Sequence, residues 1–167
     1  MLRRGLMIPL GRACYRIANL LIVADRRMRS SHGRGVKLIV NGGDRGVLLV
    51  RHTYGHRHWT FPGGRVRRDE TTATAARREL EEELGLTPPA LRELGSYPVN
   101  IRRRTEVIEV YLTETSEPVG IAAPIELDRA EWFRPDDLPD DIDPRVSLAL
   151  GLLAGRRAEQ AAASRHG

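Results

Sequence analysis

The clearest hydrophobic pattern of the chain lies between residues 72 and 86 and predicts an amphipathic helix. Ala73, Ala76, Leu80 and Leu84 recur at spacings of three and four residues, which places them on one helix face. A threonine at position 71 or 72 supplies the N-cap hydroxyl, and Gly85 stands where a helix turns left-handed and ends. We therefore expect a helix over residues 73–84 with one face against a core.

Short runs of β-branched and aliphatic residues predict strands on both sides of this helix. Residues 36–40 (VKLIV) and 47–51 (VLLVR) flank the turn-rich segment 41–46, which predicts a hairpin of two core strands. Residues 91–99 and 107–113 predict two further strands, with arginines at 102–104 in the connection. A last helix is expected to start at Asp143-Pro144, with Val146, Leu150 and Leu153 facing the core.

The first 29 residues have a different pattern, which predicts a basic amphipathic helix over Leu10–Arg29. Its longest apolar run, residues 17–24, is far shorter than the ~20 residues needed to cross a bilayer. Two interpretations remain open: peripheral contact with an anionic membrane surface, or an arm packed on the body or on the second subunit of a homodimer. The second is favoured. The predicted organisation is an arm and linker at 1–34, a domain at 35–155 and a polar, fraying tail at 156–167.

Composition narrows the class of protein. A chain of 167 residues fits one domain, which buries roughly 70% of its unfolded surface. Cys14 is the only cysteine, which excludes an intramolecular disulfide and fits a reducing, cytoplasmic location. Residues 1–35 hold eight arginines and one acid, a charge of +7, whereas residues 36–167 hold 19 basic and 21 acidic residues, a charge of −2. The net charge of +5 is therefore weak evidence for a nucleic-acid partner, and none is expected.

The predicted helix also carries an acidic face. Glu79, Glu82 and Glu83 stand at i, i+3 and i+4, where each like-charge pair costs about 0.2–0.5 kcal/mol in an isolated helix. Clustered hard oxygen ligands suit Mg²⁺ or Mn²⁺. The ELEEE run alone is more typical of a solvated acidic face, so the wider spacing has to decide between the two interpretations.

That spacing runs from Gly64 to Leu86 and reads G-x5-E-x7-R-E-U-x-E-E-x-G-U, where U is an aliphatic residue. It matches the signature of the Nudix hydrolases at every defined position, and the chain therefore resembles a MutT-like member of that family. The motif covers 23 residues, and a weaker resemblance extends over residues 35–139. The later segment from Glu126 to Trp132-Phe133 is similar to the family's E-[IL]-x-x-x-x-W-F strand.

The resemblance implies an α/β fold, an α/β/α sandwich with a mixed β-sheet. It also implies hydrolysis of the pyrophosphate bond of a nucleoside diphosphate linked to another moiety, with Mg²⁺ as cofactor and Mn²⁺ as a substitute. The implied substrate is a nucleoside triphosphate or an ADP-ribose-type sugar nucleotide. A catalytically silent, nucleotide-sensing domain is the alternative, which the complete set of carboxylates disfavours.

The same resemblance assigns roles to individual residues. Glu79, Glu82 and Glu83 are expected to hold the metal, and Glu79 is the expected general base in MutT-like enzymes. Arg78 is expected to orient a carboxylate. Further expected metal contacts are a backbone carbonyl of Gly63 or Gly64, Glu70 through water, and Glu126, which is also an alternative base.

Substrate contacts are expected from the loop before the motif and from the later hairpin. The first group is His52, Tyr54 and Trp59, although core packing is equally expected for Trp59. The second is Arg102 and Arg104, for which a solvated hairpin tip is the favoured alternative. A zinc site at His52, His56 and His58 is disfavoured because no cysteine lies nearby to complete it.

Overall fold

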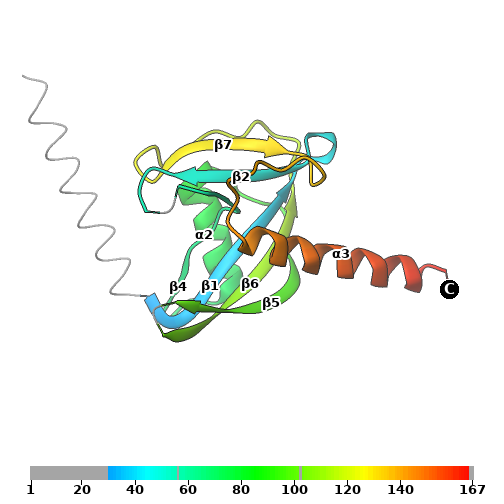
Figure 1. The fold of residues 1–167 in the computed structure, drawn as a ribbon, viewed down its shortest axis with the longest axis horizontal. Coiled ribbons are helices and arrows are strands. Elements are labelled where there is room, and N and C mark those ends of the chain that lie inside the picture. Colours follow the sequence, from blue (N-terminus) through cyan, green and yellow to red (C-terminus); the bar gives the residue numbers. More distant parts are fainter. Residues whose placement is uncertain (1–29, 56, 102, 166–167) are drawn as a thin grey trace, which may run out of the picture. The chain divides into compact units, whose positions relative to one another are not determined.

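The computed structural model describes residues 30–165, except residues 56 and 102 (Figure 1). The predicted N-terminal helix and its proposed contacts lie outside these residues. The elements are β1 (Ser30–Asn41), the 3-10 turn η1 (Gly43–Arg45), β2 (Val47–His52), β3 (Trp59–Thr60), β4 (Arg65–Arg67), α2 (Thr72–Leu84), β5 (Arg92–Ile101), β6 (Arg104–Glu114), β7 (Leu127–Phe133) and α3 (Arg145–Ala163).

The described strands form one mixed sheet. Five of them follow the order β3-β2-β1-β6-β5, while β4 pairs with β1 and β7 pairs with β2. Strand β1 is parallel to β6, with Arg34 opposite Val107, and antiparallel to β2, with Asn41 opposite Val47. The predicted hairpin and the two later strands are confirmed. Because a parallel pair requires a long crossover, the chain between β1 and β6 contains α2.

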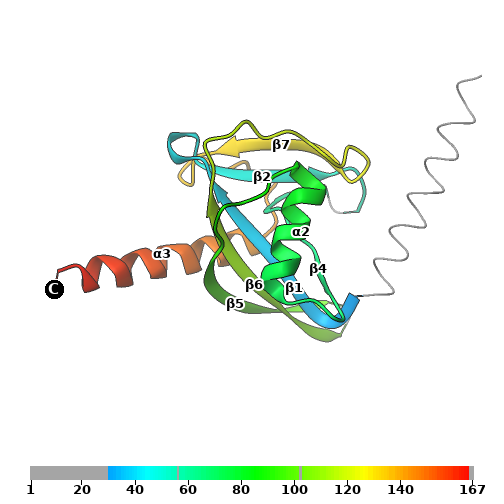
Figure 2. The ribbon, with the colours of Figure 1, turned by 180° about the vertical axis from the view of Figure 1, so that it is seen from behind.

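One helix covers each face of the sheet. Alternation along β1 sends Val36, Leu38 and Val40 into a core cluster with α2, and Ile39 into a second cluster with α3. Figure 1 shows α3 in front of β1, and Figure 2, from behind, shows α2 on the other face. The expected α/β/α sandwich is confirmed.

Helix α2 begins and ends where its sequence predicts. The Oγ1 of Thr71 accepts a hydrogen bond from the amide of Thr74 at 3.1 Å, and Gly85 adopts a φ of 66°. Ala76, Leu80 and Leu84 are buried as expected. The helix is therefore fixed at both ends and along one face, which sets the directions of its glutamates.

Two elements extend beyond the ranges expected from the sequence. Strand β1 begins at Ser30, so most of the segment predicted as a linker is strand, and from Arg34 onward it pairs with β6. Helix α3 continues to Ala163, so the predicted fraying tail from Arg156 is helical through most of its length. Alanine-rich sequence favours a helix even without packing, and every residue from Ala154 to Arg165 is exposed. No helix in the described part is long and apolar enough to cross a membrane.

Candidate active site

The acidic face of α2 is partly buried. Glu79 is 8% exposed and Glu83 is 3% exposed, so two of the three glutamates have left bulk water. Buried carboxylates require hydrogen bonds or a neighbouring positive charge. The groups that hydrogen-bond with these carboxylates or carry charge near them therefore determine the chemistry of this face.

Arg78 is the positive group of this face, and its side chain is only 13% exposed. Its Nε and Nη2 donate to the two carboxylate oxygens of Glu70 at 2.8 and 2.9 Å. Its Nη1 donates to Glu79 at 2.6 Å and to Glu82 at 3.1 Å. The planar guanidinium of Arg78 thus orients three carboxylates. The family resemblance implied that it orients one. Burial alone would lower the pKa of Arg78. Its hydrogen bonds with Glu70 and Glu79 and the charges of these two carboxylates have the larger, opposite effect, so the pKa of Arg78 is raised.

Arg67, the last residue of β4, also holds Glu70 and Glu82. The amide of Arg67 donates to Glu70 at 3.0 Å, and its guanidinium donates to Glu82 at 3.2 Å. Burial raises the pKa of the Glu70 carboxyl, but the bonds from Arg78 and Arg67 outweigh it and lower the pKa. Glu70 is therefore an ionised anchor for Arg78.

The glycine pair before the motif approaches the glutamates closely. The amide of Gly63 donates to the Oε2 of Glu83 at 3.0 Å. A Cβ on Gly64 would lie 2.5 Å from the Oε1 of Glu79, and one on Gly63 would lie 2.3 Å from the carbonyl oxygen of Val36. Only glycine fits at Gly63, where the clash is with backbone and φ is 133°, whereas a side chain at Gly64 would displace the Glu79 carboxylate.

The carbonyl groups around this pair differ in their engagement. The Gly64 carbonyl accepts a hydrogen bond from the amide of Val36 at 2.9 Å, and the Pro62 carbonyl accepts one from Leu38 at 3.0 Å. The Gly63 carbonyl is not part of this ladder with β1. Of the two glycine carbonyls considered from the sequence, Gly63 is thus the better candidate for a metal contact, and Gly64 is needed for its missing side chain.

Glu126 lies close to α2, and His52, the last residue of β2, lies close to Glu126. The charge of Glu126 acts on Glu83, and the Glu126 carbonyl accepts a hydrogen bond from the amide of Thr53 at 3.0 Å. Burial and the charge of Lys37 lower the pKa of His52 to about 4, although a backbone hydrogen bond with Glu126 opposes the fall, so its imidazole is neutral at pH 7. The structure therefore brings the late glutamate close to the motif helix, and His52 close to that glutamate.

Glu83 shows the electrostatic strain of this arrangement. Burial and the charge of Glu79 raise its pKa to about 8, although Lys37 and the Gly63 amide oppose the rise. No three histidine, cysteine, aspartate or glutamate side chains in the described ranges form a preformed metal cage. The donors nonetheless fit a hard divalent cation, because they are carboxylate oxygens, two of them buried and mutually repelling.

This raised pKa predicts how the stability of the metal-free protein depends on pH. Between about pH 4.5 and 8 the unfolded chain releases the Glu83 proton while the folded chain retains it, so rising pH favours unfolding. In EDTA, the midpoint of thermal unfolding should therefore fall between pH 6.5 and 8.5 more for the parent protein than for Glu83→Gln. Identical slopes for the two proteins would contradict this assignment. The measured range, from pH 6.5 to 8.5, lies above the range in which His52 titrates.

The other residues expected to contact the substrate have different surroundings from one another. Trp59 is 4% exposed and packs edge-on against Phe133 at 5.0 Å between centroids, so the structure assigns it to the core, the alternative given for it from the sequence. Tyr54 is 50% exposed, with its ring 6.4 Å from that of His52. Arg104 is an exposed residue at the start of β6, while Arg102, like His56, is outside the described residues.

Lys37 is a residue near the site that the sequence interpretation missed. It interrupts the apolar run of β1, and its Nζ donates to the carbonyl of Phe61 at 2.6 Å. The charges that act on it include Glu83 and Glu79. Two features of the sequence could have identified it: Lys37 is the only lysine in the chain, and it is the only polar residue in the strand segment VKLIV.

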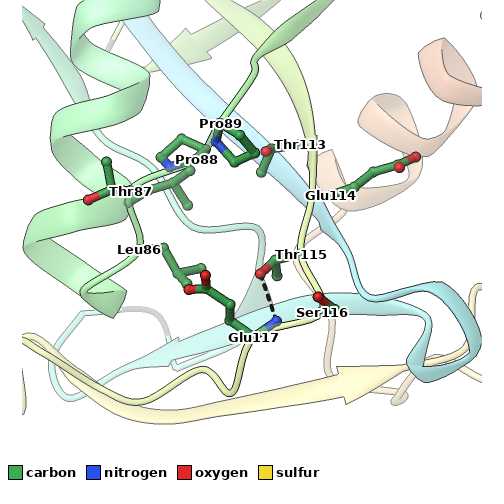
Figure 3. A pocket seen from close by; sticks show the side chains of 10 residues that line it. Leu86, Thr87, Pro88, Pro89, Thr113, Glu114, Thr115, Ser116 and Glu117 are labelled. Carbon is green, nitrogen blue, oxygen red and sulfur yellow. Dashed lines mark hydrogen bonds between the residues drawn. The ribbon is translucent and has the colours of Figure 1, made fainter.

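A separate cavity of about 130 Å³ lies beyond the C-terminal end of α2 (Figure 3). The loop after the helix forms one wall with Leu86, Pro88 and Pro89, and the end of β6 with the following turn forms another, where the amide of Glu117 donates to Thr115. None of the motif glutamates lines this cavity, so it is distinct from the candidate active site.

Comparisons with known proteins agree with this fold and site. The family model of the NUDIX domain matches residues 31–150. Oxidized purine nucleoside triphosphate hydrolase from Danio rerio is 32% identical over 102 residues, covering 61% of this chain and 65% of that protein. RNA pyrophosphohydrolase from Marinomonas sp. is 33% identical over 90 residues, covering 54% of this chain and 52% of that protein. The chain thus spans less than two thirds of either relative.

A solved structure, that of the MutT NUDIX hydrolase from Burkholderia pseudomallei, superimposes with a TM-score of 0.66 at 26% identity. The match covers 72% of this chain and 96% of that one. A mixed sheet between two helices, one of which bears an arginine-clamped carboxylate cluster, defines the class of MutT-like α/β proteins. Because the domain model matches well over half of the sequence, this chain belongs to the Nudix family.

Proposed function

We propose that this chain is a Mg²⁺-dependent pyrophosphohydrolase that cleaves the pyrophosphate bond of a nucleoside diphosphate derivative. The observation that supports it best is the arrangement of Glu79 and Glu83, buried on α2 against the amide and the open Cα of the Gly63-Gly64 pair. A solvated acidic face would not bury two carboxylates at this position. It would also not require glycine opposite them.

The carboxylates of Glu79, Glu82 and Glu83 would hold the metal, with the Gly63 carbonyl and Glu126 as further oxygen donors. Bound Mg²⁺ supplies neutralisation of phosphate charge and a lowered pKa for water, which phosphoanhydride hydrolysis chiefly requires. In the described structure Arg78 fixes the rotamers of Glu79 and Glu82 through its bonds. The protein's own contribution is therefore a rigid set of ligands in place before substrate arrives.

Nucleoside triphosphates are the proposed substrates, ahead of ADP-ribose-type sugar nucleotides. The names of the relatives support this order, since one acts on oxidized purine nucleoside triphosphates and the other is an RNA pyrophosphohydrolase. Both substrates present a 5′-phosphoanhydride chain attached to a nucleoside.

A panel of nucleoside triphosphates, sugar nucleotides and dinucleotides, assayed with Mg²⁺ and then Mn²⁺, tests the proposal. We expect hydrolysis of at least one triphosphate with release of a nucleoside monophosphate or diphosphate, measured by chromatography. EDTA should abolish it. Tight nucleotide binding by calorimetry without product over hours would instead support a catalytically silent domain.

A further inference from the structure

The cavity beyond the C-terminal end of α2 is large enough for a small molecule. Its volume of about 130 Å³ is roughly four times the share of liquid volume that one water molecule takes (Figure 3). Leu80, which follows Glu79 on α2, is one of its lining residues. A molecule in this cavity would therefore contact the helix that carries the candidate metal ligands, at a place that none of the motif glutamates lines.

Both walls of this cavity are rigid. On one side, Pro88 and Pro89 have fixed φ angles and almost no side-chain freedom to lose. On the other side, Arg45 holds the turn after β6 from outside the cavity lining. Its Nη2 donates to the carbonyl of Thr115 at 2.7 Å, and its Nη1 donates to the carbonyl of Glu117 at 3.2 Å. The cavity is thus formed before a ligand arrives, which lowers the entropic cost of binding.

The charge of the lining is negative. Glu114 and Glu117 contribute carboxylates, and none of the described residues that line the cavity is a lysine, an arginine or a histidine. The C-terminal end of α2 adds the negative end of a helix dipole. Figure 3 shows the carboxylate of Glu117 beside Leu86, whereas the side chain of Glu114 points away from the cavity. The cavity therefore disfavours phosphates and nucleotides and attracts a cation at Glu117.

The remaining lining residues indicate what kind of cation fits. The hydroxyl of Thr113, a residue only 4% exposed, already donates to the carbonyl of Ala90 at 2.8 Å, so it can only accept a further hydrogen bond. Leu80, Leu86 and the two proline rings supply apolar contacts. A primary alkylammonium ion has the matching combination, because it joins three N–H donors to a short apolar chain.

We propose that this cavity is a second ligand site, which binds a small primary alkylammonium ion: the ammonium donates to the carboxylate of Glu117, and the alkyl chain packs against Leu80, Leu86 and the prolines. This inference does not depend on the proposed function, because no metal, nucleotide or motif glutamate takes part in it. A cavity that is only a packing defect would bind a neutral molecule of the same shape equally well.

The test titrates n-butylammonium, its neutral analogue n-butanol and its anionic analogue butyrate into the full chain, in EDTA and at constant ionic strength. Two-dimensional amide NMR should show saturable shifts at Leu86, Thr87, Thr115 and Glu117 with n-butylammonium, and a Kd of about 1 mM or tighter. n-Butanol should bind about 5-fold or more weakly, because it lacks the charge that pairs with the carboxylate. Butyrate should leave these amides unshifted.

Two variants locate the contact. Glu117→Gln keeps the shape of the side chain and removes its charge, so it should weaken n-butylammonium about 5-fold and leave n-butanol affinity unchanged. Glu114→Gln is the matched control, because it removes the same charge from a side chain that points away from the cavity, and it should weaken n-butylammonium less than about 2-fold. Both residues are exposed, so both variants should fold, which their ligand-free spectra check.

The inference is overturned by any of three results. The first is the absence of saturable shifts at the cavity amides with n-butylammonium. The second is n-butanol binding as tightly as n-butylammonium, which would mean that the cavity is only an apolar void. The third is parental affinity for n-butylammonium in Glu117→Gln, which would place the ammonium elsewhere.

Discussion

Glu83→Gln should lose at least about 100-fold in hydrolysis rate while the protein stays folded. The glutamine carbonyl can still accept the bond from the Gly63 amide at 3.0 Å, so the local geometry is retained. Its neutral side chain, however, is a poor ligand for a hard divalent cation. Removing the repulsion with Glu79 should also leave the midpoint of thermal unfolding in EDTA at pH 8 unchanged or raised, because Glu79 raises the pKa of Glu83.

The matched control for this variant is Glu81→Gln, on the same helix and exposed. It removes the same charge without touching the cluster and should retain parental activity. Steady-state rates at saturating Mg²⁺, with circular dichroism of each protein, distinguish a lost ligand from a lost fold. Glu82→Gln is also expected to lower the hydrolysis rate. Parental activity in Glu83→Gln would show that the metal site is assigned wrongly.

Arg78→Met should give the largest loss of stability among substitutions in the motif. Arg78 is 13% exposed and hydrogen-bonds with Glu70, Glu79 and Glu82, so its removal deprives three carboxylates of their shared cation. Breaking a buried ion pair in this way costs about 3–5 kcal/mol. For a chain of this size, that corresponds to a fall of roughly 6–20 °C in the unfolding midpoint.

Thermal unfolding of Arg78→Met and of Arg77→Met tests this expectation, since Arg77 is the exposed neighbour on α2. Arg77→Met should unfold within about 2 °C of the parent protein, because an exposed residue changes stability by less than about 0.5 kcal/mol. Added Mg²⁺ should recover part of the loss in Arg78→Met by neutralising the carboxylates. A midpoint for Arg78→Met equal to that of Arg77→Met would mean that the clamp contributes nothing to the fold.

Sequence patterns predicted the secondary structure around the site because each element carries its own local signal. The cap residues Thr71 and Gly85 and the apolar spacing between them are properties of the helix alone. The early start of β1 has the opposite cause. Pairing of β1 with β6 extends the strand back to Arg34, and no local pattern encodes a partner more than sixty residues away.

The sequence predicted which residues form the site, but not how they contact one another. Motif spacing identified the residues of the clamp, but it could not show that one guanidinium bonds with Glu70, Glu79 and Glu82 together, because that depends on how β4 approaches α2. Trp59 could have lined a pocket or the core until Phe133 was seen against it. Lys37 went unrecognised because its neighbours come from distant parts of the chain.

The parallel pairing of β1 with β6 also governs the order in which this protein can fold. Pro62 and Gly64 are held to β1 by hydrogen bonds from the amides of Leu38 and Val36, and α2 lies within the crossover that joins β1 to β6. Closing so long a loop is slow, and its entropic cost comes before the contacts that repay it. The carboxylate cluster should therefore assemble late in folding, and Mg²⁺ should act on the finished domain rather than on its nucleus.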